Sequence, residues 1–184
     1  MSTGNKIFWI IFIIIFLIVN GYLSHKKSIH HKKIKQAKKI YKNFNSKEYN
    51  INENNKSWLF NYLRKIDPFV FEELVLYAFK CNGFKIKRNK KYTGDGGIDG
   101  RVKINQQQYL IQVKRYTNYI NPSHVEQFAH VCKNQKKLGF FVHTGKTGSS
   151  AKEISNNHPN IKIISGDKLV KLLTNDIRNE SWTK

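Results

Sequence analysis

The chain has 184 residues, which is enough for one ordinary domain with an appendage. Its 33 lysines and arginines outnumber 12 acidic residues, and the formal net charge is +21. This excess argues against a cytoplasmic enzyme for a small neutral substrate and indicates a polyanionic partner, either nucleic acid or an anionic membrane surface. Its two cysteines, Cys81 and Cys132, lack CxxC spacing, which argues against a zinc site or a disulfide framework.

An apolar segment near the N-terminus predicts a transmembrane helix. The run begins at Ile7, is unbroken to Val19 and extends through Leu23, giving 17 residues. That length corresponds to about 25 Å of helix, which is short but sufficient to span a bilayer. Trp9 and Tyr22 stand near its two ends, where interface aromatics are common. The residues that follow lack the small-residue site of a cleaved signal peptide, so an uncleaved anchor through residues 7–23 is expected.

A basic collar follows the apolar run. Eight lysines and no acid occur from His25 to Lys42, whereas Lys6 alone precedes the run. This imbalance predicts a single-pass protein of the inner (cytoplasmic) membrane with its C-terminal domain in the cytoplasm. The collar has two interpretations, attraction to anionic headgroups or an arm that grips DNA. The expected organisation is an anchor over residues 1–24, a basic linker over 25–56 and a soluble domain over 57–184.

Hydrophobic periodicity predicts an α/β arrangement for the soluble domain. Asp67 and Pro68 are a favourable N-cap and first position for a helix that Gly83 would end. Strands are expected at 84–87, 98–104 and 108–115, then a helix at 122–137, a strand at 140–144, a helix at 149–157, a strand at 161–164 and a helix at 167–173. This order predicts an antiparallel meander followed by strands that helices connect.

The two central strands also predict a register. A two-residue turn at Gln106-Gln107 matches the apolar side chains of the two strands on one face. The polar face then sets Asp99 opposite Lys114, with Gln112 beside them. The sequence therefore predicts that a carboxylate, an amide and an ammonium group meet.

Such a face suits metal-assisted hydrolysis of a phosphodiester. A carboxylate such as that of Asp99 binds a hard cation such as Mg²⁺, which activates water and stabilises charge on the phosphoryl oxygens. Gln112 can offer its carbonyl oxygen, and Lys114 can orient the attacking water and neutralise the same charge. Glycines on both sides of Asp99 allow close approach of a DNA backbone. The alternative is a weak surface pair between Asp99 and Lys114.

An ordered set of motifs resembles the catalytic domain of Mrr-like (type IV) restriction endonucleases, in the PD-(D/E)xK nuclease superfamily. The motifs are Phe71-Glu72-Glu73-Leu74-Val75, Gly83-Phe84, Gly94-Asp95-Gly96-Gly97-Ile98-Asp99-Gly100, Gln112-Val113-Lys114-Arg115-Tyr116, Phe140-Phe141-Val142-His143-Thr144 and Gly166-Asp167-Lys168-Leu169. The resemblance covers roughly residues 66–175. It implies a restriction-endonuclease-like α/β fold, with a mixed central sheet flanked by helices.

The resemblance also implies roles for the site residues. Asp99 is then a metal ligand, Gln112 occupies the position of the usual second acid and Lys114 is the catalytic lysine. Glu72 matches a glutamate of the first helix that can reach the metal, with Glu73 as the fallback. The implied cofactor is Mg²⁺ or Mn²⁺.

Basic and aromatic residues near these motifs are candidates for DNA binding. Arg115 and Tyr116 are expected either to contact phosphate or to flank the strand. Lys90 and Lys91 lead into the glycine-rich turn and are candidates to grip phosphates beside the cleft, with a solvated charged loop as the alternative. Asp95 is expected to form the turn itself.

Four histidines of the soluble domain show no metal-ligand spacing. They are expected on the surface or on helix faces, and they are His124, His130, His143 and His158.

The function expected from these observations is a membrane-anchored, Mg²⁺-dependent DNA endonuclease, with restriction of foreign DNA as its role. The alternatives are a non-catalytic DNA-binding tether and a repair or resolvase-type nuclease for branched DNA. Better-known members carry an N-terminal DNA-reading domain where this chain has its membrane segment, so recognition of modified bases is not carried over. The resemblance allows a homodimer, since nucleases of this kind often cut both strands as dimers.

Overall fold

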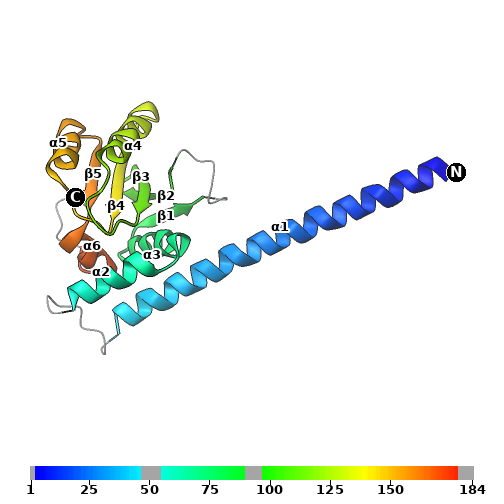
Figure 1. Ribbon diagram of the computed structural model, residues 1–184, viewed down its shortest axis with the longest axis horizontal. Coiled ribbons are helices and arrows are strands. Elements are labelled where there is room, and N and C mark those ends of the chain that lie inside the picture. Colours follow the sequence, from blue (N-terminus) through cyan, green and yellow to red (C-terminus); the bar gives the residue numbers. More distant parts are fainter. Residues whose placement is uncertain (1–2, 47–54, 90–96, 178–184) are drawn as a thin grey trace.

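The computed structural model describes residues 3–46, 55–89 and 97–177. Its centre is a five-stranded sheet with the order β1-β2-β3-β4-β5, and helices cover both faces (Figure 1). The elements are α1 (Thr3–Phe44), α2 (Lys56–Lys65), α3 (Pro68–Cys81), β1 (Lys85–Arg88), β2 (Gly100–Ile104), β3 (Gln107–Lys114), α4 (Pro122–Asn134), β4 (Leu138–His143), α5 (Ser149–Asn157), β5 (Ile161–Ile164) and α6 (Gly166–Leu173). The predicted order of elements is confirmed from α3 to α6.

The sheet combines two kinds of pairing. Strands β1, β2 and β3 form an antiparallel meander, while β3, β4 and β5 are parallel and are connected through α4 and α5. The predicted meander followed by helical crossovers is therefore confirmed. Parallel strands need such long connections, and their helices cover the sheet.

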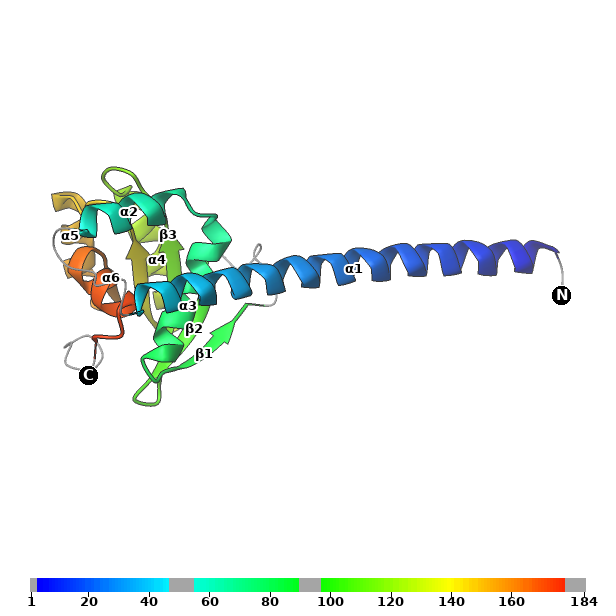
Figure 2. The ribbon, with the colours of Figure 1, turned by 90° about the horizontal axis from the view of Figure 1, so that it is seen from below.

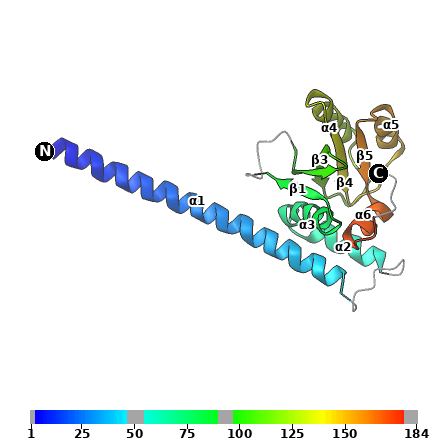
Figure 3. The same cartoon turned by 180° about the vertical axis from the view of Figure 1, so that it is seen from behind.

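Two hydrophobic cores lie on opposite faces of the sheet. On one face Val102, Ile111 and Phe140 pack with residues of α2, α3 and α6. On the other face Leu110 and Phe141 pack with residues of α4 and α5. Figure 3 shows these helix layers on either side of the strands. Because β3 is buried on both faces, the polar side chains near its end are held in a rigid setting.

Local capping sets the limits of α3, the helix that carries the two candidate glutamates. The Asp67 side chain accepts a hydrogen bond from the Val70 N–H at 3.2 Å, and Pro68 occupies the first turn. At the other end Gly83 has a φ of +91°, a left-handed conformation that favours glycine. Both predicted ends of this helix are confirmed.

The hairpin between β2 and β3 differs from the predicted register. Gly100 pairs with Ile111, and the turn is Asn105-Gln106, whose φ angles are 46° and 68°. The pairing is therefore displaced by two residues, which places Asp99 beside Gln112 instead of opposite Lys114. Side chains alternate with a period of two, so this displacement leaves every residue on its predicted face. Turn geometry decided between the two registers, because left-handed positions suit a tight hairpin and Asn tolerates them.

The segment expected to be a basic linker is helical as far as Phe44. Helix α1 continues from the apolar run through this segment without a break and crosses α3 (Figure 2). Four of its side chains are buried in the core with α3, namely Ala37, Ile40, Tyr41 and Phe44. Apolar spacing of three to four residues within the lysine-rich sequence gives this packing face. The second half of α1 is therefore a layer of the folded domain.

Polar contacts join α1 to the domain at several points. The Lys33 ammonium donates to the Asp67 carboxylate at 2.6 Å, and the Asn45 side chain donates to the Leu173 carbonyl at 2.8 Å. The ring of Tyr41 meets that of Tyr77 edge-on, with centroids 5.3 Å apart. These contacts fix the direction in which the helix leaves the domain.

The first half of α1 has the opposite character. Its large apolar side chains from Trp9 to Leu23 are exposed, and the apolar stretch is not buried inside the described structure. The helix is long and apolar enough to cross a membrane by length and composition. Contiguous exposed apolar surface of this size is unusual in water-soluble proteins, which makes this half a candidate membrane span.

Removing one of the buried α1 side chains should destabilise the whole domain. Phe44 is 4% exposed, so Phe44→Ala is expected to lower the free energy of unfolding by about 3–5 kcal/mol. Denaturant unfolding of the detergent-solubilised protein measures this change. Gln36→Ala, at an exposed position of the same helix, is the control and should change stability by less than about 0.5 kcal/mol. Equal effects of the two substitutions would mean that α1 is not part of the folded domain.

Candidate active site

Asp99 lies immediately before β2 and is held against β3 by two hydrogen bonds. Its backbone N–H donates to the Ile111 carbonyl at 2.8 Å, and its Oδ2 accepts from the Val113 N–H at 2.6 Å. Burial raises the pKa of the Asp99 carboxyl to about 6, although the Val113 N–H and the Lys114 charge oppose the shift. The side chain is therefore pinned in an environment that favours a counter-charge.

Gln112 is the buried amide of the site. Its side chain is 8% exposed, and within the described residues its Oε1 has no hydrogen-bond partner. A Cβ at Gly97 would stand 2.4 Å from Gln112 Nε2, so glycine makes room for the amide there. A buried oxygen without a partner costs free energy, and such an oxygen in a native structure fits a missing ligand.

Lys114 ends β3 and lines a cavity of about 250 Å³ together with Gly97, Gln112 and residues of α4. The α4 contribution includes His124 and Gln127. His124 therefore lies on a helix face, as expected, and that face lines the cavity. The polar positions at the start of α4 give no sequence signal, because only the packing of α4 on the sheet brings them over β3.

Glu72 approaches the same charges from α3. Burial raises its pKa to about 8, with further raising by the charges of Asp99 and Glu73, while Lys114 lowers it. Two carboxyl groups that repel one another at one site attract a cation when both are ionised. The structure thus brings Asp99, Gln112 and Lys114 together at the end of β3, and it sets Glu72 within electrostatic range of Asp99 and Lys114.

Glu73, the fallback for Glu72, has a different setting. It is 2% exposed, and its Oε2 accepts from the Arg88 Nε at 2.6 Å. The His30 Nε2 of α1 lies 3.8 Å from its other oxygen. Buried charges need such partners. Glu73 therefore links α1, α3 and β1. Glu72, in contrast, is the glutamate whose pKa responds to the charges of Asp99 and Lys114.

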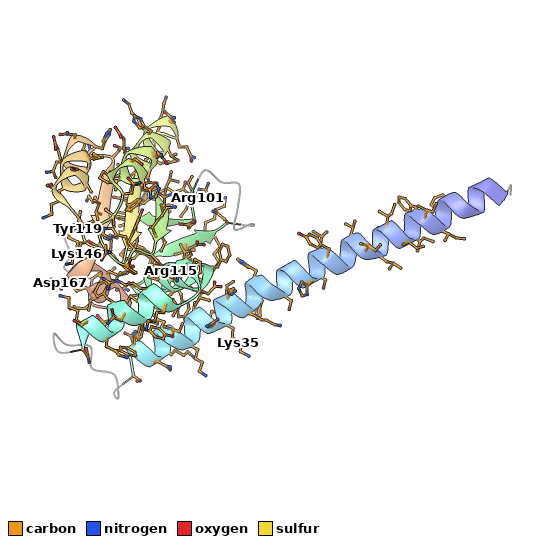
Figure 4. All side chains as sticks on the ribbon, viewed as in Figure 1. Lys35, Arg101, Arg115, Tyr119, Lys146 and Asp167 are labelled. Carbon is orange, nitrogen blue, oxygen red and sulfur yellow. The ribbon has the colours of Figure 1, made fainter. Side chains whose placement is uncertain are left out.

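Arg115 points inward in the structure. Its Nη1 donates to the Arg64 carbonyl at 3.0 Å and also to the Ile66 carbonyl, between α2 and α3 (Figure 4). These contacts favour the strand-flanking alternative for Arg115. Its contact with DNA phosphate stays a prediction.

Tyr116 lies beside the cavity. Its hydroxyl is hydrogen-bonded to His124 Nδ1, and its backbone N–H donates to Thr144 Oγ1 at 3.0 Å. Tyr116 thereby positions the α4 histidine that lines the cavity. Its predicted contact with DNA is untested, and Lys90, Lys91 and Asp95 lie outside the described residues.

His143 is a correction to the expected surface position. It is fully buried at the end of β4, and burial lowers its pKa to about 4. Its Nδ1 accepts from the Gly145 N–H at 3.2 Å, which assigns the ring proton to Nε2, 3.1 Å from Thr147 Oγ1. A neutral histidine satisfied in this way is a structural residue of the core.

Among residues 3–46, 55–89 and 97–177, no three His, Cys, Asp or Glu side chains form a group suited to a metal ion. The donor set at this site is instead two carboxylates and one amide oxygen. Oxygen donors of this kind suit Mg²⁺ and Mn²⁺ more than softer metals.

The family model for the Mrr catalytic domain, described as a restriction endonuclease, matches residues 63–173, which is more than half of the chain. The chain belongs to this family. Its Mrr catalytic domain thus comprises α3, the complete sheet and the helices that follow, with part of α2. The predicted family is confirmed.

A curated relative is the type IV methyl-directed restriction enzyme EcoKMrr of Escherichia coli strain K12. It is 29% identical over 126 residues, which cover 64% of this chain and 40% of the relative. The chain therefore spans less than half the length of that enzyme.

Two solved structures of restriction endonucleases are similar to this chain. The MspJI restriction endonuclease in complex with a 27-mer oligonucleotide matches over 71% of this chain and 34% of its own, with a TM-score of 0.53 and 20% identity. The restriction endonuclease FokI matches over 70% and 28%, with a TM-score of 0.44 and 13% identity. The likeness to MspJI shows that the fold is restriction-endonuclease-like, as predicted.

The raised pKa of Glu72 has a consequence for stability. Between its ordinary value of 4.5 and about 8, Glu72 is protonated in the folded protein and ionised in the unfolded chain. Folding then takes up a proton, so stability falls as the pH rises through this window. In EDTA, the thermal midpoint of wild type should fall more between pH 5 and pH 8.5 than that of Glu72→Gln. Parallel pH profiles for the two proteins would show that the pKa of Glu72 is not raised.

Proposed function

We propose that the protein is a membrane-anchored, divalent-metal-dependent DNA endonuclease. The observation that carries this proposal is the grouping of Asp99, Gln112, Lys114 and Glu72 in a domain of the Mrr family. The family supports a nuclease, and the chemical types of the site residues support metal-dependent hydrolysis of a phosphodiester.

The residues fit a divalent cation. Carboxylate oxygens of Asp99 and Glu72 would hold it, together with the Oε1 of Gln112, which has no hydrogen-bond partner in the described part of the chain. When bound, Mg²⁺ or Mn²⁺ supplies positive charge for the phosphoryl oxygens and lowers the pKa of water. The same charge would reverse the raised pKa values of both carboxyl groups, which is the physical reason that they tolerate one another.

The other groups of the chain act on the phosphodiester and the attacking water. Lys114 places a positive charge beside the reacting phosphate and orients water on the side of Gln112. His124, held by the Tyr116 hydroxyl, presents its ring at the wall of the same cavity. The cavity opens between β3 and α4, so the phosphate would enter between the sheet and that helix.

Simultaneous cleavage of both strands would use two such sites, and a second copy of the chain would supply the other one.

The membrane assignment rests on α1. Its exposed apolar half would span the bilayer, and the lysines after it favour a cytoplasmic domain. Because Lys33 contacts Asp67 at the start of α3, the helix leaves the domain close to the end of α3 that carries Glu72. DNA that enters the cell would thus meet the nuclease near the membrane, which suits restriction of foreign DNA.

A non-catalytic DNA tether is the second candidate. The strong positive charge supports it. The buried oxygen of Gln112, which no described residue hydrogen-bonds, lies near two carboxyl groups and would have no use in a tether. A nuclease for branched DNA would use the same site and differ in substrate.

Removing the site charges should abolish cleavage of plasmid DNA. With Mg²⁺, Asp99→Asn and Lys114→Met are each expected to lower the cleavage rate by about 10²–10³-fold or more, because each group acts on charge that builds in the transition state. EDTA should stop the wild-type protein, and a supercoiled-plasmid assay measures all three effects.

Lys103→Met, at an exposed position of β2, is the matched control and should cut at the wild-type rate. Unchanged cleavage by the Asp99 and Lys114 variants would overturn the assigned site. Wild-type protein that binds DNA without cutting it would support the tether. Linear and four-way-junction substrates separate restriction from resolution.

Charges placed in the apolar half of α1 should release the protein from membranes. Lysine at the centre of a span costs about 2.5–3.5 kcal/mol per residue, so Ile14→Lys combined with Ile15→Lys should move the protein into the soluble fraction. Carbonate extraction measures the distribution, and Ser28→Lys, beyond the apolar run, is the control. A wild-type protein that is soluble without detergent would contradict the anchor.

A further inference from the structure

Four lysines form one exposed stripe along the second half of α1. Lys32, Lys35, Lys39 and Lys42 recur at intervals of three and four residues, which places them on one side of a helix. All four are exposed, and α1 contains no acidic residue. They line a shallow groove of about 750 Å³ that Tyr77 of α3 also borders. We call this surface the lysine stripe.

The stripe faces away from the sheet. At 3.6 residues per turn, Lys35 lies nearly opposite the middle of the buried face formed by Ala37, Ile40, Tyr41 and Phe44. Figure 4 shows Lys35 on the outer side of α1. Lys33, one position after Lys32, is instead turned toward the domain and bound to Asp67. The packing of α1 therefore turns Lys33 toward the domain and leaves the four lysines of the stripe facing outward.

The continuity of α1 sets the distance between the stripe and a bilayer. At about 1.5 Å per residue, Lys35 lies about 18 Å and Lys42 about 28 Å beyond the end of the apolar run at Leu23. Headgroups occupy roughly 5–7 Å of this distance. The remaining distance for Lys35, Lys39 and Lys42 is about 10–20 Å, which exceeds the physiological Debye length of about 8 Å. Attraction to lipid headgroups is therefore largely screened for most of the stripe.

We propose that the lysine stripe binds the phosphate backbone of duplex DNA outside the segment held in the active site. This inference rests on the proposed function, because it needs both a DNA substrate and a spanning α1. A duplex carries one negative charge per about 1.7 Å of its axis. The stripe spans about 15 Å of rigid helix, and over that length a duplex carries about nine phosphate charges, which is more than enough to pair with all four lysines.

The partner is recognised through charge alone. Exposed lysines act as point charges without base contacts, so the stripe would hold any sequence. The stripe would raise the local concentration of DNA beside the membrane. Cleavage itself would take place at the candidate active site in the domain on which α1 packs.

The test uses the full chain in nanodiscs of neutral phosphatidylcholine. Fluorescence anisotropy of a 40-base-pair duplex is measured in EDTA over a series of salt concentrations. For the variant Lys32→Gln/Lys35→Gln/Lys39→Gln/Lys42→Gln, the slope of log affinity against log salt should fall by about 3 to 4. At 150 mM salt its affinity should fall at least about tenfold.

The matched control removes four exposed lysines from α4, the loop after α4, α5 and β5, with the variant Lys133→Gln/Lys136→Gln/Lys152→Gln/Lys162→Gln. It has the same net charge as the stripe variant, and its salt slope should fall by less than about 1. Cleavage in Mg²⁺ adds a second readout. The stripe variant should show a raised KM and an unchanged kcat, because the stripe does not touch the reacting phosphate.

Each outcome decides the inference. Equal salt slopes for the stripe and control variants would overturn the inference. Cleavage by wild type in the Mg²⁺ assay would then leave the proposed function intact. A stripe variant that loses only its binding to anionic phosphatidylserine vesicles would assign the lysines to lipid and overturn it as well. Wild type that binds DNA through the stripe but never cuts would support the stripe and overturn the nuclease. Wild type that neither binds nor cuts would overturn both.

Discussion

The packing of α1 on α3 is the contact on which the rest of this arrangement depends. The buried face of α1 completes the core beneath the sheet, and Lys33 and His30 reach carboxylates at the start of α3. A single rigid helix thereby connects an exposed apolar segment to the helix that carries Glu72. A flexible linker would let the domain rotate freely relative to the apolar half of α1. This packing instead holds the site in one orientation relative to that candidate membrane span.

The candidate site is held in place by groups that have structural tasks of their own. Backbone hydrogen bonds to β3 pin Asp99, and the Arg88 pair keeps the neighbouring Glu73 out of the site. The remaining groups repel one another or lack a partner: Asp99 and Glu72 are partly buried, the charge of Asp99 raises the pKa of Glu72, and the Gln112 oxygen has no hydrogen-bond partner among the described residues. A cation would relieve all three conditions at once. This is why the arrangement fits a metal-dependent nuclease more closely than a tether.

Local signals predicted those parts of the fold that local physics decides. The cap at Asp67 and the glycine at 83 set the ends of α3, and apolar spacing located the strands and crossover helices. The register between β2 and β3 escaped prediction because a displacement of two residues changes no face. Burial of His143 and the cavity-lining position of His124 escaped for another reason. Both depend on how α4 and β4 pack, and neither residue type reveals this.

The amino-acid sequence by itself determined the family of this protein and the candidate residues of its site. Its motifs carry the family, its apolar run and lysine excess indicate a membrane and a polyanion, and Asp99, Gln112 and Lys114 can be named from alternation and resemblance. Only the tertiary structure decided which of two adjacent glutamates faces the site and whether the lysines after the apolar run form a linker or a helix. Both outcomes depend on which side chains are buried between elements that are distant in sequence. That burial stabilises the protein only when the whole core is assembled, so no local stretch of sequence reveals it.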